Sequence, residues 1–342
     1  MKEKTGKAQR VENPRQAKDE NAKEKALEAS YRRWDTEAFS ALVKKAYARY
    51  ENCRLCPRNC GVNRCKGEKG FCRTKDQAIV SSSGPHFGEE DPLVGKRGSG
   101  TVFFANCQLR CVFCQNYTIA HEGQGRLVED ETLARMMLSL QREGCHNINL
   151  VTPTHVVPNI LSAVEKARVK GLTVPICYNT SSYEEVETLQ MLSGVVDLYL
   201  ADMKWMDEEQ AAVYAEKEPS DYPEKAKQAI TEMYQQVGPL VTDDEGIAQR
   251  GLMLRHLVMP NKVAGTKSFV QWVANNLSPD VYVNIMGQYR PAHKATDYEA
   301  IARKITHQEF EEAVQMAREA GLVNLDERSI SQFQAFHRRL FR

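Results

Sequence analysis

The sequence has no long apolar run and no excess of one sign of charge. No segment approaches the roughly 18 apolar residues that a membrane-spanning helix needs, and 46 Lys and Arg residues oppose 45 Asp and Glu residues. The first 32 residues contain no apolar block, so we expect no secretory signal in that stretch. We therefore expect a cytoplasmic protein that makes no membrane contact. Nucleic acid is not an expected partner, because the sequence has no basic stripe with interleaved aromatic residues.

Cysteine, in contrast, is abundant. The chain has ten cysteines, and its 42% hydrophobic and 27% charged residues are typical of a protein that buries a core. In a reducing compartment, cysteines serve mainly in metal binding, catalysis or packing. Eight of the ten fall into two groups. The other two, Cys145 and Cys177, lie on or beside expected core strands, so we expect them to be buried packing residues.

From residue 101 onward, apolar strand-like runs alternate with amphipathic stretches. The expected strands are 101–106, 147–152, 173–178, 197–202, 253–259 and 281–286. Expected helices lie near 31–50, 133–144, 159–170, 183–192, 222–236, 267–276 and 306–321. This alternation predicts an α/β protein with a partial (β/α)6, TIM-like barrel, and right-handed crossovers would bring the six carboxyl ends to one rim.

The pattern divides the chain into four parts. Residues 1–30 are a charged tail that we expect to be disordered, and 31–100 are a helix followed by a cysteine-rich metal-binding module. The module is dense in Cys, Gly, Pro and charge, a composition that needs a metal or another staple to hold its shape. Residues 101–292 are the expected barrel, and 293–342 are a C-terminal helical segment.

The second cysteine group has the spacing C-x3-C-x2-C directly after the first expected strand. It consists of Cys107, Cys111 and Cys114. Three thiolates on one tight loop can hold three irons of a cubane cluster and leave the fourth iron without a protein ligand, which makes a chemical site. Clusters that only transfer electrons normally use four cysteines. A closed zinc site would likewise need a fourth ligand, for which His121 is the nearest candidate.

At these residues the sequence resembles the radical S-adenosylmethionine (radical SAM) superfamily. The three-cysteine motif is the hallmark of that superfamily, including the aromatic Phe113 before the last cysteine, which we count among the cofactor-binding candidates. The resemblance implies a [4Fe-4S] cluster on the three catalytic cysteines, with S-adenosylmethionine (SAM) on the open iron. An electron from an external flavodoxin- or ferredoxin-like donor would then cleave SAM and release a 5′-deoxyadenosyl radical for hydrogen abstraction.

Within the superfamily, the chain resembles the activating enzymes of glycyl radical enzymes. It is most similar to the pyruvate formate-lyase activating enzyme-like iron–sulfur proteins of the PflX type. The stretches that carry this resemblance are 98–104, 114–117, 147–155, 201–204 and 286–291. The resemblance implies that the partner is a glycyl radical enzyme or another protein or peptide substrate.

Polar residues follow the second and third expected strands, where the resemblance places SAM. Thr152, Pro153 and Thr154 occupy the position of a Gly-Gly-Glu-like segment that meets the SAM amino group; a plain turn at a strand end is the alternative. Asn179 occupies a position where related enzymes carry an Asp that helps to bind a monovalent cation. This departure leaves cation binding open.

After the fourth strand, Asp202 and Lys204 alternate with Met203, so both side chains should point to one face. The resemblance implies that Lys204 meets the SAM carboxylate and that Asp202 lines the same pocket. A surface ion pair is the alternative. Further rim candidates are Arg255, His256, Gln288, Tyr289 and Arg290, and His155 and His293 could be acids, bases or surface residues.

The first cysteine group contains five thiols in twenty residues: Cys53, Cys56, Cys60, Cys65 and Cys72. Four ligands suffice for zinc or for a cubane cluster, so one thiol is surplus. We expect Cys65 to be the surplus one, because related proteins look most regular at the other four. Zinc would be a structural staple, whereas a second iron–sulfur cluster would be an electron relay or a substrate ligand. The neighbouring chemistry favours a cluster slightly.

These observations support a radical SAM enzyme that abstracts hydrogen from an unactivated C–H bond. Activation of a glycyl radical enzyme rests on resemblance alone. Modification of a peptide or small metabolite is the alternative within that class, and a non-catalytic zinc or iron–sulfur binding module is the alternative from another class.

Overall fold

Six parallel strands form the centre of the molecule. The structure is a computed structural model that describes residues 28–340. The strands are β2 (Ser99–Phe104), β4 (Ile148–Val151), β5 (Ile176–Thr180), β6 (Leu198–Asp202), β8 (Ala248–Leu257) and β9 (Tyr282–Met286). Each pairs in parallel with the next along the chain. All six expected strands are therefore confirmed, and the α/β fold with a mainly parallel sheet is consistent with a partial barrel.

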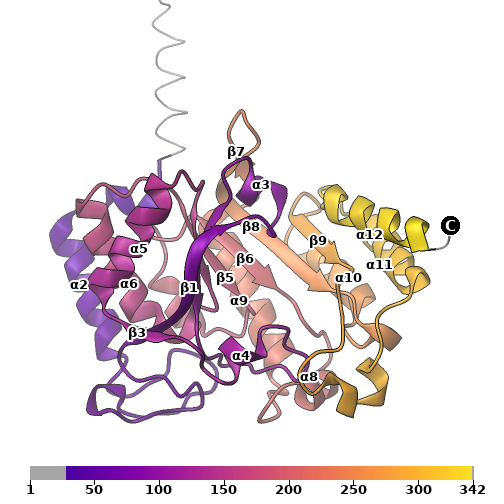
Figure 1. Cartoon of the computed structure of the whole chain (residues 1–342), viewed down its shortest axis with the longest axis horizontal. Helices are drawn as coiled ribbons and strands as arrows, with labels where there is room; N and C mark the ends of the chain where they lie inside the picture. Colours follow the sequence, from indigo (N-terminus) through magenta and orange to yellow (C-terminus); the bar gives the residue numbers. More distant parts are fainter. Residues whose placement is uncertain (1–27, 341–342) are drawn as a thin grey trace, which may run out of the picture.

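Three further strands extend the sheet in antiparallel fashion. They are β1 (Ala78–His86), β3 (Arg126–Val128) and β7 (Val241–Thr242), paired with β2, β1 and β8 respectively. Residues 51–100 show little periodicity in the sequence, yet β1 lies within them and crosses the front of the molecule in Figure 1. A bulge between Val80 and Ser82 interrupts its alternation, which hides the strand from pattern reading. The sheet thus begins before residue 101.

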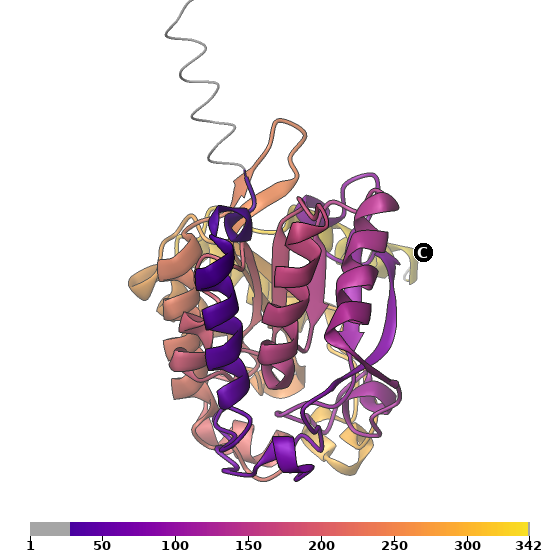
Figure 2. The same cartoon turned by 90° about the vertical axis from the view of Figure 1, so that its left-hand side faces the viewer.

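The helices lie mostly on the outer face of the sheet, whereas α3 (Asp91–Val94) packs against the barrel interior. The other helices are α2 (Thr36–Ala48), α4 (Tyr117–Ala120), α5 (Asp130–Arg142), α6 (Val157–Val169), α7 (Val186–Gln190), α8 (Glu208–Tyr214), α9 (Tyr222–Val237), α10 (Thr266–Asn276), α11 (His307–Glu319) and α12 (Glu327–Leu340). Short 3₁₀ turns are η1 (Ser30–Arg33), η2 (Arg64–Lys66), η3 (Thr154–Val156), η4 (Pro260–Lys262), η5 (Ala295–Asp297) and η6 (Glu299–Ile301). Figure 2 shows α2, α6 and α5 side by side on one flank.

The ends of the chain differ in how well the pattern predicts them. Two elements, η1 and α2, occupy the range 31–50, where a helix was expected. Residues 1–27 of the expected charged tail lie outside the described residues. At α11 the capping box between Thr306 and Glu309 is confirmed, and Gly321 has the left-handed φ of +85° that ends this helix. The final helix, α12, lies in the expected C-terminal helical segment, but the sequence pattern did not mark it as a separate helix; it contacts β9. Within the described residues, none of the helices combines the length and apolarity needed to cross a membrane.

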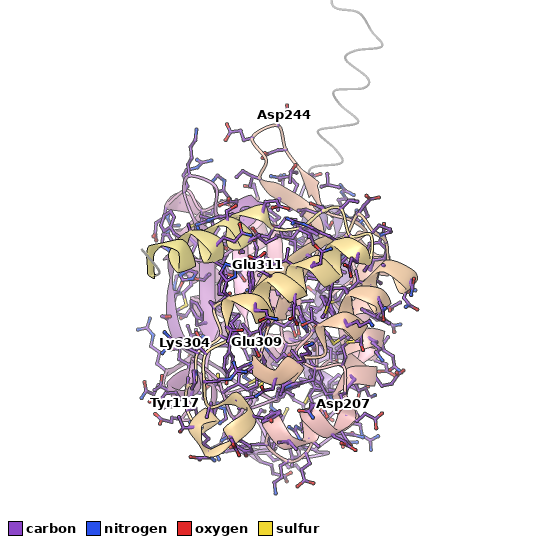
Figure 3. The ribbon with its side chains drawn as sticks, turned by 90° about the vertical axis from the view of Figure 1, so that its right-hand side faces the viewer. Tyr117, Asp207, Asp244, Lys304, Glu309 and Glu311 are labelled. Atoms are coloured by element: carbon purple, nitrogen blue, oxygen red, sulfur yellow. The ribbon has the colours of Figure 1, made fainter. Side chains whose placement is uncertain are left out.

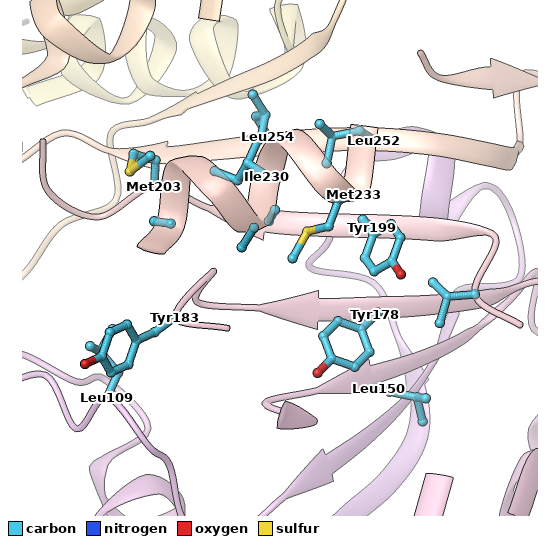
Figure 4. Close-up of a cluster of buried hydrophobic side chains, with 14 of the residues drawn as sticks. Leu109, Leu150, Tyr178, Tyr183, Tyr199, Met203, Ile230, Met233, Leu252 and Leu254 are labelled. Carbon is cyan, nitrogen blue, oxygen red and sulfur yellow. The ribbon is translucent and has the colours of Figure 1, made fainter. Parts of the chain in front are cut away.

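The apolar core has two parts, because strand residues alternate between the two faces of the sheet. Tyr199 lies beside Met233 of α9 and donates to Gln236 of the same helix, and the ring of Tyr178 packs edge-on against Tyr199 (Figure 4). The inward-facing residues form a second cluster made of Cys177, Leu198, Leu200, Ala248, Met253 and Tyr282, which Leu93 of α3 joins. Each of these strand residues lies at least two positions before the last residue of its strand, so the barrel interior is filled below the carboxyl ends. Open space for a site remains at the carboxyl ends.

Candidate functional site

The three motif cysteines lie on one loop between β2 and α4, which we call the motif loop (residues 106–116). Asn106 and Arg110 have positive φ values of 70° and 56°, and these turn the chain tightly at two points. An isolated bridge pairs Cys111 with Ala215, and the N–H of Val112 donates to Tyr214 at 2.9 Å. Backbone pairing therefore fixes the middle of the loop against the chain that follows α8.

The thiols of the motif loop are close enough to affect one another. Burial raises the pKa of Cys111, and the Cys107 and Cys114 thiols raise it further, while Lys204 lowers it. Burial and Cys107 raise the pKa of Cys114 to about 11. The N–H of Leu109 points at the Cys107 sulfur at 3.4 Å. Convergent thiols that receive N–H donors fit a cluster bound through thiolates.

His121 does not complete the motif loop as a fourth ligand. Its Nε2 donates to the carbonyl of Cys111 at 3.0 Å, and its Nδ1 lies 3.5 Å from Glu216. Burial lowers the pKa of His121 to about 4. Among residues 28–340, no group of three or more His, Cys, Asp or Glu side chains is arranged to hold a metal ion. The zinc alternative therefore has no support at this loop.

Phe113 lies in an aromatic cluster behind the motif loop. It is buried, and its ring packs edge-on against Trp205 at 5.7 Å and Tyr289 at 5.9 Å between centroids. Tyr289, one of the rim candidates, is itself buried and donates to the carbonyl of Ile301 at 2.7 Å. Both rings thus form an apolar wall next to Cys114. A contact of Phe113 with a cofactor stays a prediction.

Asp202, Lys204 and Asn179 meet at Arg255 beside the motif loop. Arg255 donates to Asp202 at 2.7 Å and to Asn179 at 2.8 Å, and Lys204 donates to Asp202 at 2.9 Å. Burial disfavours the charged carboxylate, but Arg255 and Lys204 outweigh it and lower the pKa of Asp202. Burial likewise opposes the ammonium, but Asp202 and Cys111 raise the pKa of Lys204 to about 12. The group is therefore an ionised network and not a surface ion pair.

The period of the strands explains why these side chains meet. Asn179, Asp202 and Arg255 follow the inward-facing apolar residues Cys177, Leu200 and Met253 by two positions on their strands. Each polar side chain therefore lies one layer above the apolar filling of the barrel. The sequence identified Asp202, Lys204 and Asn179 as site candidates but placed Arg255 only among the weaker rim candidates. In the structure Arg255 is the centre of the network.

The segment after β4 supports the motif loop through hydrogen bonds. The buried Thr154 hydroxyl donates to Glu184 at 2.6 Å and accepts from Gln108 at 2.7 Å. Thr152 has a positive φ of 60°, and its N–H donates to Asn179 at 3.0 Å. Pro153 is buried between them. These contacts give Thr154 a positioning role towards Gln108 of the motif loop, and contact of the segment with SAM stays a prediction.

Glu184 is a buried acid that sequence reasoning missed. Its carboxylate also accepts from Thr180 and from Tyr178 at 3.3 Å. Burial raises the pKa of Glu184 to about 7, although these hydroxyl donors lower it. The helix expected at 183–192 therefore begins only at Val186, because the residues before it are held in this network. No sequence signal marks Glu184, since only the fold brings Thr154, from the segment after β4, next to it.

Two histidine candidates have structural partners. His256 is fully buried, with Nδ1 against the Met203 carbonyl at 2.9 Å and its ring stacked on Phe269 at 4.5 Å. His293 stacks on Tyr117 at 5.1 Å and lies 4.4 Å from the His121 ring. Neither reaches the Arg255 network, so a role of either histidine as an acid or base has no support here.

A cavity of about 540 Å³ lies beside Arg255. Its lining comes from the turn after β1, from β8 and β9 and from the C-terminal segment, and includes Glu89, Glu90, Asn284, Gln288, Arg290 and Lys304. Glu89 accepts from Arg255 at 3.1 Å, and Glu90 accepts from Asn284 at 2.8 Å. Burial raises the pKa of Glu90. The acids were missed because a Glu-Glu-Asp run usually indicates a solvated turn.

The site end of the molecule is opposite the hairpin of β7 and β8. Figure 3 shows Tyr117 and Asp207 at one end, after the motif loop and before α8, and Asp244 at the tip of the hairpin at the other. The strands point towards Tyr117 and Asp207, so the motif loop and the Arg255 network lie where sites in parallel α/β folds are built.

The first cysteine group also closes on one place at this end. Cys53, Cys56, Cys60 and Cys72 line a single pocket together with Arg58, Arg64, Gly70 and His155, and we call it the four-cysteine pocket. Cys65 is exposed and does not line it. The structure thus brings together the four expected ligands and leaves out the expected surplus thiol. Cys145 and Cys177 are buried, as expected.

Comparison with known proteins agrees with this geometry. Residues 101–243 match the model of the radical SAM superfamily. An uncharacterized protein of Methanocaldococcus jannaschii is 32% identical over 282 residues, which cover 80% of this chain and 76% of that protein. The chain belongs to the radical SAM superfamily. A [4Fe-4S] cluster and SAM are the cofactors of this superfamily.

Solved structures are more distant. A radical SAM methyltransferase from Sphaerobacter thermophilus matches 66% of this chain and 64% of its own, with 13% identity and a TM-score of 0.44. HydG, a maturase of the [FeFe]-hydrogenase, matches 64% of this chain and 48% of its own, with 13% identity and a TM-score of 0.45. The chain thus spans less than two thirds of either solved chain, and its substrate must be argued from its own residues.

Proposed function

We propose that this radical SAM enzyme abstracts a hydrogen atom from a glycine in a partner glycyl radical enzyme. The proposal is carried by one observation: Lys204 lies near Cys111 of the motif loop and shares Asp202 with Arg255, which lines a cavity of about 540 Å³. When bound, the cluster supplies the electron that breaks a carbon–sulfur bond of SAM and yields the 5′-deoxyadenosyl radical.

Each residue of the chain has a role in this proposal. Cys107, Cys111 and Cys114 would hold three irons as thiolates. Lys204 uses one of its three ammonium donors on Asp202, so two remain for the carboxylate of SAM. Arg255 holds Asp202 from the other side at 2.7 Å and fixes the direction in which Lys204 points.

The cavity supports a peptide as the substrate. Oε2 of Glu90 and Oδ1 of Asn284 are buried acceptors without a hydrogen-bond partner among the described residues. A buried acceptor without a donor costs about 1–3 kcal/mol, and peptide N–H groups would relieve that cost. Both residues line the cavity.

A small metabolite or a short free peptide is the second candidate. The cavity volume of about 540 Å³ lies within the range of about 300–1,000 Å³ that is typical of small-molecule sites. Arg290 and Lys304 in its lining would recognise an anionic group. This candidate needs no partner protein.

The test is reductive SAM cleavage by anaerobically prepared protein. We expect 5′-deoxyadenosine and methionine to form with a low-potential flavodoxin, and Cys111→Ala to abolish both. With a candidate glycyl radical enzyme added, electron paramagnetic resonance should detect a glycyl radical. Cleavage without such a radical, together with a modified small molecule by mass spectrometry, would favour the second candidate. Absence of any cleavage in iron-loaded protein would favour a non-catalytic binding module.

A further inference from the structure

Two of the sulfurs that line the four-cysteine pocket receive an N–H donor. The donors are the backbone N–H of Phe71, directed at Cys60, and the guanidinium of Arg64, directed at Cys53. The Phe71 contact measures 3.3 Å and the Arg64 contact 3.8 Å. Hydrogen bonds to sulfur are typical of thiolates that ligate a metal centre. Two such contacts, in a pocket that four thiols line, fit a site built for thiolates.

Arg64 is a buried cation that points at this pocket. It has no exposed surface, and no carboxylate in residues 28–340 forms an ion pair with it. Its guanidinium donates to the carbonyls of Lys75 and His155, the latter at 2.7 Å, and lies 3.9 Å from the Tyr50 ring. An unpaired buried charge costs several kcal/mol. Thiolates at the pocket would supply the missing negative charge.

Gly70 lies against Cys60 in the pocket, where there is no room for a side chain. A Cβ added to Gly70 would lie 2.8 Å from the sulfur of Cys60. The pocket itself is small, about 10 Å³. No group of three or more of its cysteine and histidine side chains is arranged to hold one metal ion. The same is true of the three motif cysteines, which the family uses to bind a cubane cluster.

We propose that Cys53, Cys56, Cys60 and Cys72 bind a second cubane iron–sulfur cluster. In such a cluster each iron takes its own thiolate, so the sulfurs need not surround a single ion. The site is distinct from the motif loop and needs no SAM for its assembly. The inference goes beyond the proposed function and does not depend on it.

The four-cysteine pocket lies next to the motif loop. Arg58, between Cys56 and Cys60, donates through Nε to the carbonyl of Gln108 at 2.8 Å and through a terminal nitrogen to Leu109 at 3.3 Å. The ring of His155, which lines the four-cysteine pocket, contacts the carbonyl of Ala105 at 2.9 Å. A cluster at the second site would therefore hold the backbone on both sides of Cys107.

The test separates the two sites by substitution in the full chain. A triple variant with Cys107, Cys111 and Cys114 changed to Ala should retain about four irons and four sulfides per chain, with a [4Fe-4S] Mössbauer spectrum. The wild type should hold about eight irons. Cys60→Ala and Gly70→Ala should each lower the iron of the triple variant, whereas Cys65→Ala, the matched control on the same segment, should leave it unchanged.

Stoichiometric zinc in the triple variant would overturn the proposal, and so would a triple variant that folds, by circular dichroism, without metal. Cys60→Ala and Gly70→Ala are single, local changes, so they keep the test informative if a variant that lacks all four cysteines fails to fold. SAM cleavage is not measured in the triple variant. A failure of the proposed function would therefore leave this result unaffected.

Discussion

The motif loop and the four-cysteine pocket both contain cysteine thiols and lie at the same end of the molecule, yet the residues around the thiols differ. Figure 1 shows the segment that carries the pocket as a long loop below α2 and α5, at the end where α4 lies. Cys111 lies near a lysine and an aspartate whose shared partner, Arg255, lines a cavity. The pocket instead has a buried arginine and no comparable cavity. The residues around the thiols, and not the cysteine spacing alone, distinguish a site that carries out chemistry from a structural site.

The strongest test of this contrast removes one thiol from each region. We expect Cys111→Ala to reduce 5′-deoxyadenosine release to background, because the motif loop has no spare thiol. Cys65→Ala should leave release unchanged, since Cys65 is exposed and outside the pocket. Chromatography of the quenched reaction measures both. Full activity of Cys111→Ala would remove the motif loop from the mechanism.

The next test removes the cation next to Cys111. Lys204→Met should lower SAM cleavage about 10- to 100-fold, the usual cost of losing a partner that supports a metal site. The loss should appear mainly in the KM for SAM, because Lys204 has donors free for a carboxylate. Lys225→Met is the control, since Lys225 pairs with Glu185. Equal losses in the two variants would contradict the assigned role of Lys204.

A pH test examines the support behind the motif loop. The folded pKa of Glu184 is about 7, against an ordinary value of 4.5, so the folded chain favours the neutral acid. The stabilisation is complete below pH 4.5 and is lost as pH rises through 7. It amounts to about 3 kcal/mol, at about 1.4 kcal/mol per pKa unit.

Glu184→Gln should remove that pH dependence. Urea unfolding at pH 5 and pH 8 measures it as the difference between variant and wild type, and the variant should gain relative stability at pH 8. Glu187→Gln, an exposed change on α7, should keep the wild-type dependence. An unchanged slope in Glu184→Gln would show that Glu184 does not titrate in this range.

The smallest expected effect concerns the contact between the two regions. Arg58→Met removes the donors to Gln108 and Leu109 and should lower the free energy of unfolding by about 1–3 kcal/mol. Arg54→Met changes the same loop two residues before Cys56 and serves as the matched control. Denaturant unfolding of both variants provides the comparison. If the two variants have the same free energy of unfolding, the hydrogen bonds of Arg58 do not stabilise the contact between the four-cysteine pocket and the motif loop.

Much of the fold could be predicted from the sequence, because local patterns encode it. The six parallel strands follow from near-continuous apolar runs between amphipathic stretches, and the capping box at Thr306 follows from its spacing. Strand β1 could not be predicted, and α12 was not marked as a separate helix. A bulge breaks the period of β1, and the polar composition of α12 obscures its contact with β9.

The residues of the candidate site likewise divide into those that the sequence identifies and those that it does not. The three motif cysteines were identifiable because they adjoin one another in the chain. Asp202 and Lys204 were identifiable because they follow a buried strand. Glu89 and Glu184 were not singled out, and Arg255 was only one of several rim candidates, because some of their partners come from strands and loops far away in the sequence.

By itself, the sequence determined that this protein has an α/β sheet and a three-thiol motif after its first parallel strand, because hydrophobic period and residue spacing are local properties. Only the tertiary structure decided that Asp202 is shared by Arg255 and Lys204, that four thiols meet around one pocket, and that Arg58 joins that pocket to the motif loop. The hydrogen bonds among these contacts link residues up to 53 positions apart. The physical reason is that ion pairing and burial act through space, and only the folded sheet sets those distances.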